Sequence, residues 1–83
     1  MTKNEFMEIV NEEGLKNYNL YDENNLRSDE LVLTKKNQNW IVYATSERAS
    51  CVTGSEVTFD NESSALENLI ERLRADKILN YNK

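Results

Sequence analysis

The side chain best suited to act as a nucleophile in this sequence is the thiol of Cys51, and the sequence offers no base to activate it. None of the 83 residues is a histidine, so the commonest general base and the commonest metal ligand are both missing. A reactive thiolate also needs a cationic neighbour or a helix N-terminus, whereas Cys51 falls in a predicted strand. We therefore expect a buried structural cysteine and no enzymatic activity.

The other patterns that could carry chemistry are incomplete. Gly14 and Gly54 stand alone, whereas a phosphate-binding loop needs several glycines before a helix. The short acidic clusters at residues 22–23 and 60–62 lack the ligand spacing of a calcium loop, so turn and helix-cap roles explain them. We expect no cofactor and no metal.

Acidic side chains outnumber basic ones by fifteen to ten, which gives a net charge of −5 at pH 7. Nucleic-acid binding needs a basic surface that neutralises phosphates, so this balance argues against it and favours a basic partner. Solubility is an alternative reason for an acidic surface. Residues 1–30 hold eight acidic and three basic side chains, and residues 31–83 hold seven of each, so the excess lies near the N-terminus.

Two amphipathic patterns predict the helices that position these side chains. Thr2 and Glu5 form a capping box ahead of a helix over residues 3–13, which ends at Gly14. A second helix is predicted over residues 63–78, with Asp60, Asn61 or Ser63 as its N-cap. Its apolar residues recur at the helical spacing i, i+3, i+4, i+7, and they are Ala65, Leu66, Leu69, Ile70 and Leu73.

The middle of the chain is rich in β-branched and aromatic residues and predicts strands. Residues 30–35 and 40–45 form a hairpin around a polar turn, and residues 18–21 add a short strand before it. Residues 51–59 form a further strand that is interrupted near Gly54. The sequence therefore predicts one α+β domain over residues 1–83, with an N-terminal helix, a three- to four-stranded antiparallel β-meander and a C-terminal helix packed on the sheet.

Two surfaces of this fold could bind a partner. On the first helix the carboxylates of Glu5, Glu8 and Glu12 share one face, which we call the acidic ridge; a solvated helix face is the alternative interpretation. The hairpin is apolar on both faces. If both helices pack against one face, the other is left as a partly apolar patch, and if one helix lies on each face, the patch is closed. The two faces consist of Leu31, Leu33, Trp40 and Val42 on one side and Val32, Ile41 and Tyr43 on the other.

The sequence also bears on location. No apolar run follows a basic N-terminal segment, and no stretch of about 18 apolar residues occurs, so we expect neither a signal peptide nor a membrane span. A lone cysteine cannot form an internal disulfide and is typical of the reducing cytoplasm. We expect a cytoplasmic protein without membrane contact, as a monomer or weak dimer.

From about residue 18 to residue 77, the chain resembles the polymorphic-toxin immunity proteins of the immunity protein 59 family. The family carries an acidic residue where Ser46 stands, so this position departs from its pattern. The resemblance implies a cytoplasmic antitoxin that binds the toxic domain of a secreted bacterial toxin and protects the producing cell. It is carried by Glu30-Leu31-Val32-Leu33, Trp40-Ile41-Val42-Tyr43, Ser46-Glu47-Arg48-Ala49-Ser50, Phe59, Asp60, Glu62 and the helix Ala65–Leu73.

The leading functional hypothesis is therefore inhibition by occlusion, in which an acidic surface docks on a basic toxin domain and blocks its active site. The alternative is an acidic inhibitor from a phage or mobile element that mimics nucleic acid, and a third class is an enzyme or small-ligand module. Glu47 and Arg48 could instead form a loop ion pair. The residues expected to bind the partner are Glu5, Glu8, Glu12, Asp22, Glu23, Glu47 and Arg48.

Overall fold

The computed structural model describes residues 1–81, and it begins with helix α1, Lys3–Glu13. The Thr2 hydroxyl accepts a hydrogen bond from the Glu5 backbone N–H at 3.2 Å, and the Glu5 carboxylate accepts one from the Thr2 N–H at 3.1 Å. Gly14 ends the helix in the left-handed conformation, with φ of 65°, which glycine adopts without strain. The predicted first helix is thus confirmed with its capping box.

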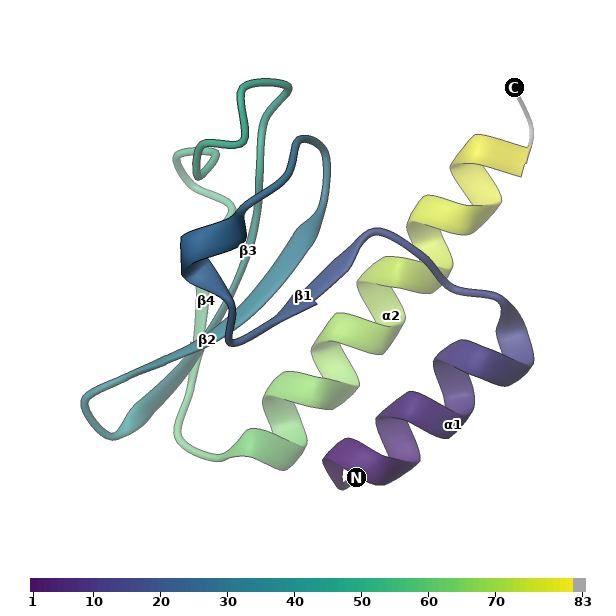
Figure 1. Ribbon diagram of the computed structural model, residues 1–83. Coiled ribbons are helices and arrows are strands. Elements are labelled where there is room, and N and C mark those ends of the chain that lie inside the picture. Colours follow the sequence, from purple (N-terminus) through teal and green to yellow (C-terminus); the bar gives the residue numbers. More distant parts are fainter. Residues whose placement is uncertain (82–83) are drawn as a thin grey trace.

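Four strands form one mixed sheet in the order β1-β2-β3-β4: β1 Tyr18–Leu20, β2 Leu31–Lys36, β3 Asn39–Ala44 and β4 Val57–Phe59 (Figure 1). Strands β2, β3 and β4 are antiparallel neighbours, but β1 runs parallel to β2. The α+β class is confirmed, and the prediction of a purely antiparallel meander is wrong at β1.

The parallel pairing follows from the way the chain leaves β1. Tyr21 adopts a left-handed conformation with φ of 63°, so the chain turns away from the strand instead of continuing into a tight hairpin. Residues 21–30 then cross over the sheet, through the short 3-10 helix η1, Glu23–Asn25, and enter β2 from the same end as β1. A crossover of this kind is what parallel neighbours require.

The hairpin of β2 and β3 matches its prediction closely. Its register pairs Leu33 with Val42 and Lys36 with Asn39, and Asn37 begins the turn with φ of 57°. The predicted strand over residues 51–59 is shorter, because only Val57–Phe59 pair with β3 as β4. Cys51 contributes an isolated bridge to Thr45, and Gly54, with φ of 87°, lies in the intervening turn.

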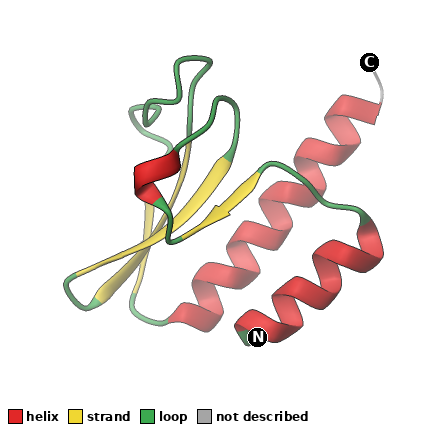
Figure 2. Cartoon of the chain, in the orientation of Figure 1, coloured by secondary structure: helices red, strands yellow, loops and turns green. Residues whose placement is uncertain are grey.

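Both long helices lie on one face of the sheet (Figure 2). Helix α2, Glu62–Tyr81, begins after Asn61, whose side-chain oxygen accepts a hydrogen bond from the Ser64 N–H at 2.8 Å. This helix is longer than the predicted 63–78. Its buried residues Leu66, Leu69, Ile70 and Leu73 pack with the sheet residues Leu31, Leu33 and Val42 and with Phe6 and Val10 of α1.

The second face of the sheet is covered by the crossover at residues 21–30. The sequence left open whether this face would carry a helix or remain an exposed apolar patch, and the crossover is a third arrangement. Neither long helix of residues 1–81 lies there, yet Val32 and Tyr43 are buried and Ile41 is partly buried. The Thr34 hydroxyl donates a hydrogen bond to the Glu23 carboxylate of η1 across this face. The crossover therefore closes most of the expected apolar patch.

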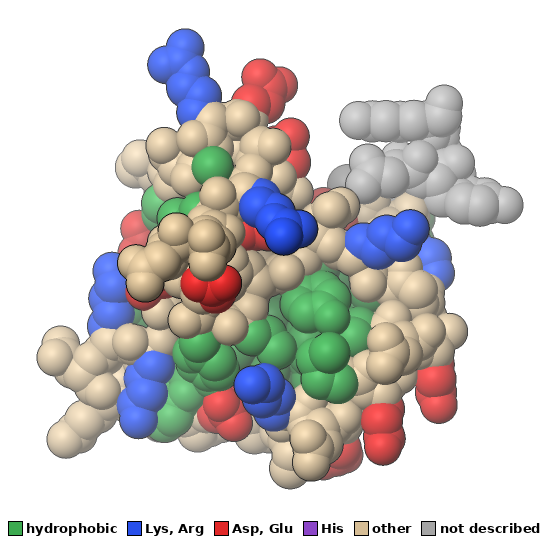
Figure 3. All heavy atoms as spheres, in the orientation of Figure 1, with side chains coloured by type: hydrophobic (Ala, Val, Ile, Leu, Met, Phe, Trp, Pro, Cys, Tyr) green, Lys and Arg blue, Asp and Glu red, His purple; other side chains and the backbone are tan. Residues whose placement is uncertain are grey.

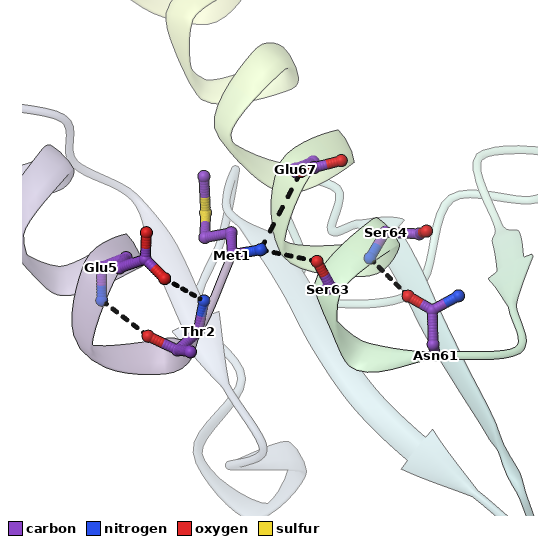
Figure 4. A network of polar contacts seen from close by, with 7 residues as sticks. All are labelled: Met1, Thr2, Glu5, Asn61, Ser63, Ser64 and Glu67. Atoms are coloured by element: carbon purple, nitrogen blue, oxygen red, sulfur yellow. Dashed lines mark hydrogen bonds and ion pairs between the residues drawn. The ribbon is translucent and has the colours of Figure 1, made fainter.

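The two helices run side by side in the same direction, and polar contacts join them at both ends (Figure 1). Near the helix starts, the Met1 ammonium donates to the Ser63 hydroxyl at 2.6 Å and lies 3.9 Å from the Glu67 carboxylate (Figure 4). At the end of α1, Arg74 Nε donates to Glu13 Oε1 at 2.9 Å, and Lys77 Nζ donates to the Glu13 carbonyl oxygen. These contacts fix the relative register of the helices.

We expect Leu69→Ala to lower the free energy of unfolding by about 2–5 kcal/mol, because it removes a fully buried side chain and leaves a cavity. Ile78→Ala is the matched control on the same helix, since Ile78 is 62% exposed and its truncation should cost about 0.5 kcal/mol or less. Urea denaturation followed by circular dichroism measures both. Equal effects of the two changes would contradict the placement of α2.

The tyrosine on the second face gives a pH-dependent prediction. Burial, followed by the nearby charge of Glu23, raises the pKa of Tyr43 to about 12 from an ordinary value of 10.0. Because the folded state holds the proton more tightly, the stability from this group is complete below about pH 10 and is lost as the pH rises towards about 12. Tyr43→Phe should therefore reduce the fall in unfolding free energy between about pH 9 and about pH 11.

The measurement for this prediction is urea denaturation of both proteins at the two pH values. Tyr21, whose pKa is also raised, first by burial and then by its hydrogen bond to Glu62, remains in the variant, so part of the fall should persist. An identical fall in both proteins would mean that Tyr43 titrates like a solvent-exposed tyrosine.

Candidate functional site

A cleft of about 660 Å³ opens where the sheet ends against the second half of α2. Strands β1 and β2 are parallel, and β3 is antiparallel to them. The starts of β1 and β2 and the end of β3 therefore lie together at one end of the sheet. The sheet side of the cleft follows from that topology, and its lining residues are Asn17, Asp29, Glu30, Leu31, Ala44, Thr45 and Glu47.

The opposite wall belongs to α2. A helix of 20 residues is about 30 Å long, whereas a strand of six residues spans about 20 Å. Helix α2 is therefore longer than the strands that it covers, and its last turns project beyond the sheet (Figure 1). Arg72, Ala75 and Asp76 line the cleft. They share a helix face because they are spaced at i, i+3 and i+4.

A compact set of hydrogen bonds joins the two loops on the sheet side. The Thr45 hydroxyl accepts from the Glu30 N–H at 2.8 Å and contacts the Arg27 carbonyl oxygen at 2.7 Å, to which it can donate. The Asp29 N–H donates to the Ser46 carbonyl oxygen at 3.1 Å. The loop that carries Glu47 is thereby attached to the start of β2, and the cleft wall is held by backbone contacts.

The cleft, which we call the acidic cleft, is strongly negative. Four acidic residues and one arginine line it, and its apolar residues are Leu31, Ala44 and Ala75. Arg72 Nη1 donates to the Ser55 carbonyl oxygen at 3.3 Å, so the one cation is engaged with the β3–β4 loop. A concave wall with charges of one sign concentrates the field and attracts a cation. The acidic residues are Asp29, Glu30, Glu47 and Asp76.

Glu30 differs from the other three because it is buried, with 6% of its surface exposed. Its Oε1 atom accepts hydrogen bonds from the Asn19 side chain at 3.1 Å and from the Arg27 N–H at 3.0 Å. These donors compensate part of the cost of burying a carboxylate. Glu30 lines both the cleft and a smaller cavity of about 280 Å³ beneath the crossover, and its carboxylate is bonded on the side of the smaller cavity, which Asn19 and Arg27 also line.

The structure separates the residues that the sequence assigned to partner binding. Glu5, Glu8 and Glu12 are exposed on α1, and acidic side chains gather over this helix at the lower right of Figure 3. Glu47 lies in the acidic cleft. The acidic ridge and the cleft are therefore two distinct acidic surfaces, because α1 lies on α2 and the cleft lies between α2 and the sheet edge.

Asp22, Glu23 and Arg48 have local contacts of their own. The Asp22 carboxylate accepts hydrogen bonds from the Asn25 side chain at 3.1 and 3.2 Å, and Glu23 accepts one from Thr34. The Arg48 N–H donates to the Ser46 hydroxyl at 3.2 Å. Within residues 1–81, no ion pair joins Glu47 to Arg48. Asp22 and Glu23 thus support the crossover, while Glu47 lines the cleft and Arg48 is exposed on the same loop.

Three carboxylates of the cleft were missed by the sequence interpretation: Asp29, Glu30 and Asp76. Asp29 and Glu30 directly precede strand β2, and this position in the sequence indicates that they lie at one end of the sheet. Asp76 follows Arg72 by one helical turn, which placed the two on one face of the predicted helix. The sequence did not indicate that the start of β2 and the second half of α2 lie close together in the fold.

The prediction that Cys51 is buried is wrong, because the side chain is exposed. The residue precedes β4 instead of lying within it, so it pairs only through its bridge to Thr45. Partial loss of solvation and the Glu56 carboxylate, whose oxygen is 3.5 Å from Sγ, raise the pKa of the thiol. The thiol therefore stays protonated at neutral pH and is a weak nucleophile.

In the part of the chain that the structure describes, no three Cys, Asp or Glu side chains are grouped so that they could hold a metal ion. None of the helices found there has the length and apolar character needed to cross a bilayer. Comparison with protein-family models, with curated proteins and with solved structures finds no match to this chain.

Thr45→Val should lower the free energy of unfolding by about 1–3 kcal/mol, because the Glu30 N–H, buried in this position, loses its acceptor. Amide hydrogen exchange at Glu30 should also become faster, because the variant lacks the hydroxyl that accepts the hydrogen bond of this N–H. Thr58→Val is the control, because Thr58 is exposed on β4. The outcome that contradicts the assigned role of Thr45 is unchanged exchange at Glu30 in the Thr45 variant.

Proposed function

We propose that this chain is a cytoplasmic immunity protein that binds the toxic domain of a cognate bacterial toxin and neutralises it by occlusion. The observation that carries the proposal is the acidic cleft, a concave surface lined by four acidic residues and one arginine. Electrostatic complementarity of this kind selects a basic protein surface and suppresses binding of acidic ones. A nuclease toxin must carry a basic surface to hold nucleic acid, so it fits the proposal well.

The proposal needs no catalytic group in the chain. Cys51 is the only cysteine, its thiol is held protonated, and the sequence contains no histidine. An inhibitor acts by filling or covering a partner's site, which requires shape, charge and a rigid surface. The hydrogen bonds of Thr45 and the helix contacts of Glu13 supply that rigidity at the cleft and at the end of α1.

The test is co-purification of the chain with the toxin domain encoded beside it, followed by an assay of toxin activity with and without the chain. Protection of the toxin's substrate at equimolar chain supports the proposal. A folded chain that neither binds nor inhibits that domain contradicts it. Phage genes in place of a toxin gene would instead favour the alternative, an acidic inhibitor that mimics nucleic acid.

The acidic ridge should act mainly on the association rate. Changing Glu5, Glu8 and Glu12 together to glutamine should slow association with the toxin domain and flatten its salt dependence, because exposed charges act over about 8 Å at physiological ionic strength. Dissociation should change less. Association kinetics at two salt concentrations measure the effect, and native rates at both would show that the ridge is only a solvated helix face.

The matched control for this experiment changes three exposed carboxylates outside the ridge and the cleft, namely Glu56, Asp60 and Glu71, to their amides. This variant has the same net charge as the ridge variant. If steering depends on position, the control should associate faster than the ridge variant at low salt. Equal slowing would assign the effect to net charge alone.

A further inference from the structure

We propose that the outer edge of β1 binds an extended segment of a partner protein, which adds to the sheet as a further strand. The segment is apolar at alternate positions and basic between them. For the identity of the partner the inference rests on the proposed function, whereas the pairing itself rests on the backbone of β1. This contact lies outside the acidic cleft and the acidic ridge.

Strand β1 ends the sheet, and part of its backbone faces away from β2. The carbonyl oxygen of Asn17 and the N–H of Tyr21 bond to β2, at 2.9 and 2.8 Å. Because successive residues of a strand direct their backbone groups to opposite sides, Tyr18 and Leu20 direct theirs outward. Within residues 1–81 no further strand lies beside β1. Two N–H and two C=O groups are therefore available to pair with an extended chain.

The opposite edge of the sheet, at β4, is less suited to pairing. In β3 the carbonyl oxygen of Ala44 faces this edge and accepts from the Val52 N–H at 2.9 Å. By the same alternation along β3 and β4, only Thr58 of β4 directs its backbone groups outward. Glu56 and Asp60 flank the strand, and exposed charges protect an edge from pairing. Strand β1, by contrast, contains neither a charged residue nor a proline.

A groove follows the outer edge of β1. The cavity of about 280 Å³ beneath the crossover is lined by Tyr18, Asn19 and Leu20, which are all three residues of the strand. Their side chains alternate between the two faces of the sheet, so a cavity that all three line extends along the edge of the strand. Residues of the crossover, Asp22 and Arg27 among them, form its other wall. The crossover therefore borders the edge and leaves it open to an added strand.

The two sides of the edge differ in chemistry and set the side chains that the segment needs. On the helix side, Tyr18 and Leu20 are partly buried and pack against the core, as does Met7 of α1. Apolar side chains gather there, at the centre of Figure 3. An added strand continues this surface with an apolar residue at every second position. On the other side, residues 21–30 of the crossover include four acidic side chains and one basic, so the intervening residues should be basic.

The charge of the crossover also disfavours a second copy of this chain as the occupant. Pairing of β1 with the β1 strand of another copy about a twofold axis would place the two crossovers side by side on one face of the joined sheet. Each crossover has an excess of acidic side chains, so like charges would meet. A basic segment of a different protein meets the opposite charge and is attracted.

The first experiment uses a synthetic probe, the peptide Val-Lys-Val-Lys-Val with an acetylated N-terminus and an amidated C-terminus. It is titrated into the ¹⁵N-labelled chain, and the backbone amide shifts are followed by NMR. The shifts should saturate and concentrate at residues 17–21, and hydrogen exchange of the Tyr18 and Leu20 amides should slow. Shifts that are absent, or that follow β4 or α1 instead, overturn the proposal.

Two peptides of the same charge serve as controls for this titration. The first is the probe with its three central amide nitrogens methylated, which keeps the side chains and removes N–H groups needed for pairing. It should bind at least about tenfold more weakly. The second, Val-Val-Val-Lys-Lys, has the same composition without the alternation and should also bind more weakly. Equal shifts with the methylated peptide would show that charge alone attracts the probe, which overturns the proposal.

The second experiment changes the edge of the chain. Leu20→Pro removes one outward N–H, and edge strands tolerate proline at such positions. Leu20→Ala is the matched control, because it loses the same side chain and keeps the N–H. The proline variant should bind the probe about tenfold more weakly than the alanine variant, whereas Thr58→Pro on β4 should leave the affinity unchanged. Equal affinity of the two Leu20 variants overturns the proposal. The methylated peptide tests the same point on the native chain, so the test does not depend on the stability of a variant.

The third experiment separates this inference from the proposed function. If the toxin domain binds the native chain, it should dissociate from the Leu20→Pro variant about tenfold faster than from the Leu20→Ala variant. A toxin domain that binds both variants equally overturns the role of the β1 edge while the immunity function stands. Failure of the toxin domain to bind the native chain contradicts the function, and the peptide titration still decides whether the edge accepts a strand.

Discussion

The burial of one apolar stripe of α2 against the sheet is the interaction on which the rest of the structure depends. Leu66, Leu69, Ile70 and Leu73 meet Leu33 and Val42, and α1 adds Phe6 and Val10 to the same core. In a chain this short, one such core supplies most of the hydrophobic stabilisation. It also sets the direction of α2, and a helix longer than the sheet that it covers must project past one edge. The acidic cleft is the space beneath that projection.

The two faces of the sheet are stabilised by different chemistry. The helix face is apolar, whereas the crossover face combines buried Val32 and Tyr43 with polar contacts of Glu23, Asn19 and Glu30. Such contacts are directional, so they hold residues 21–30 in one position where hydrophobic burial alone would allow several. The position of Glu30 depends on this arrangement, because its two donors come from β1 and from the crossover.

Local features of the sequence predicted most of the fold. The capping box at Thr2, the stop at Gly14, the spacing of Leu66, Leu69 and Ile70, and the hairpin all depend on residues close together in the chain. The direction of β1 could not be predicted in this way, because it depends on the left-handed Tyr21 and on the fit of the crossover to the sheet. Cys51 was misplaced for a similar reason, since β4 begins later than its β-branched pattern indicated. Of the cleft, only Glu47 was anticipated, because Asp29 and Asp76 meet through packing of distant segments.

The composition of the cleft from segments far apart in the chain has a thermodynamic consequence. Residues 17, 29–31, 44–47 and 72–76 come together only in the folded state, so anything that occupies the cleft binds the native chain and not the unfolded one. By mass action, an occupant present at a hundred times its dissociation constant adds about 2.7 kcal/mol to the free energy of unfolding. For a domain whose total is on the order of 4–12 kcal/mol, that increment lowers the unfolded population about a hundredfold. Proteases that degrade unfolded chains would then remove the free protein faster than the occupied one, and the cellular level of this chain would follow the supply of whatever fills the cleft.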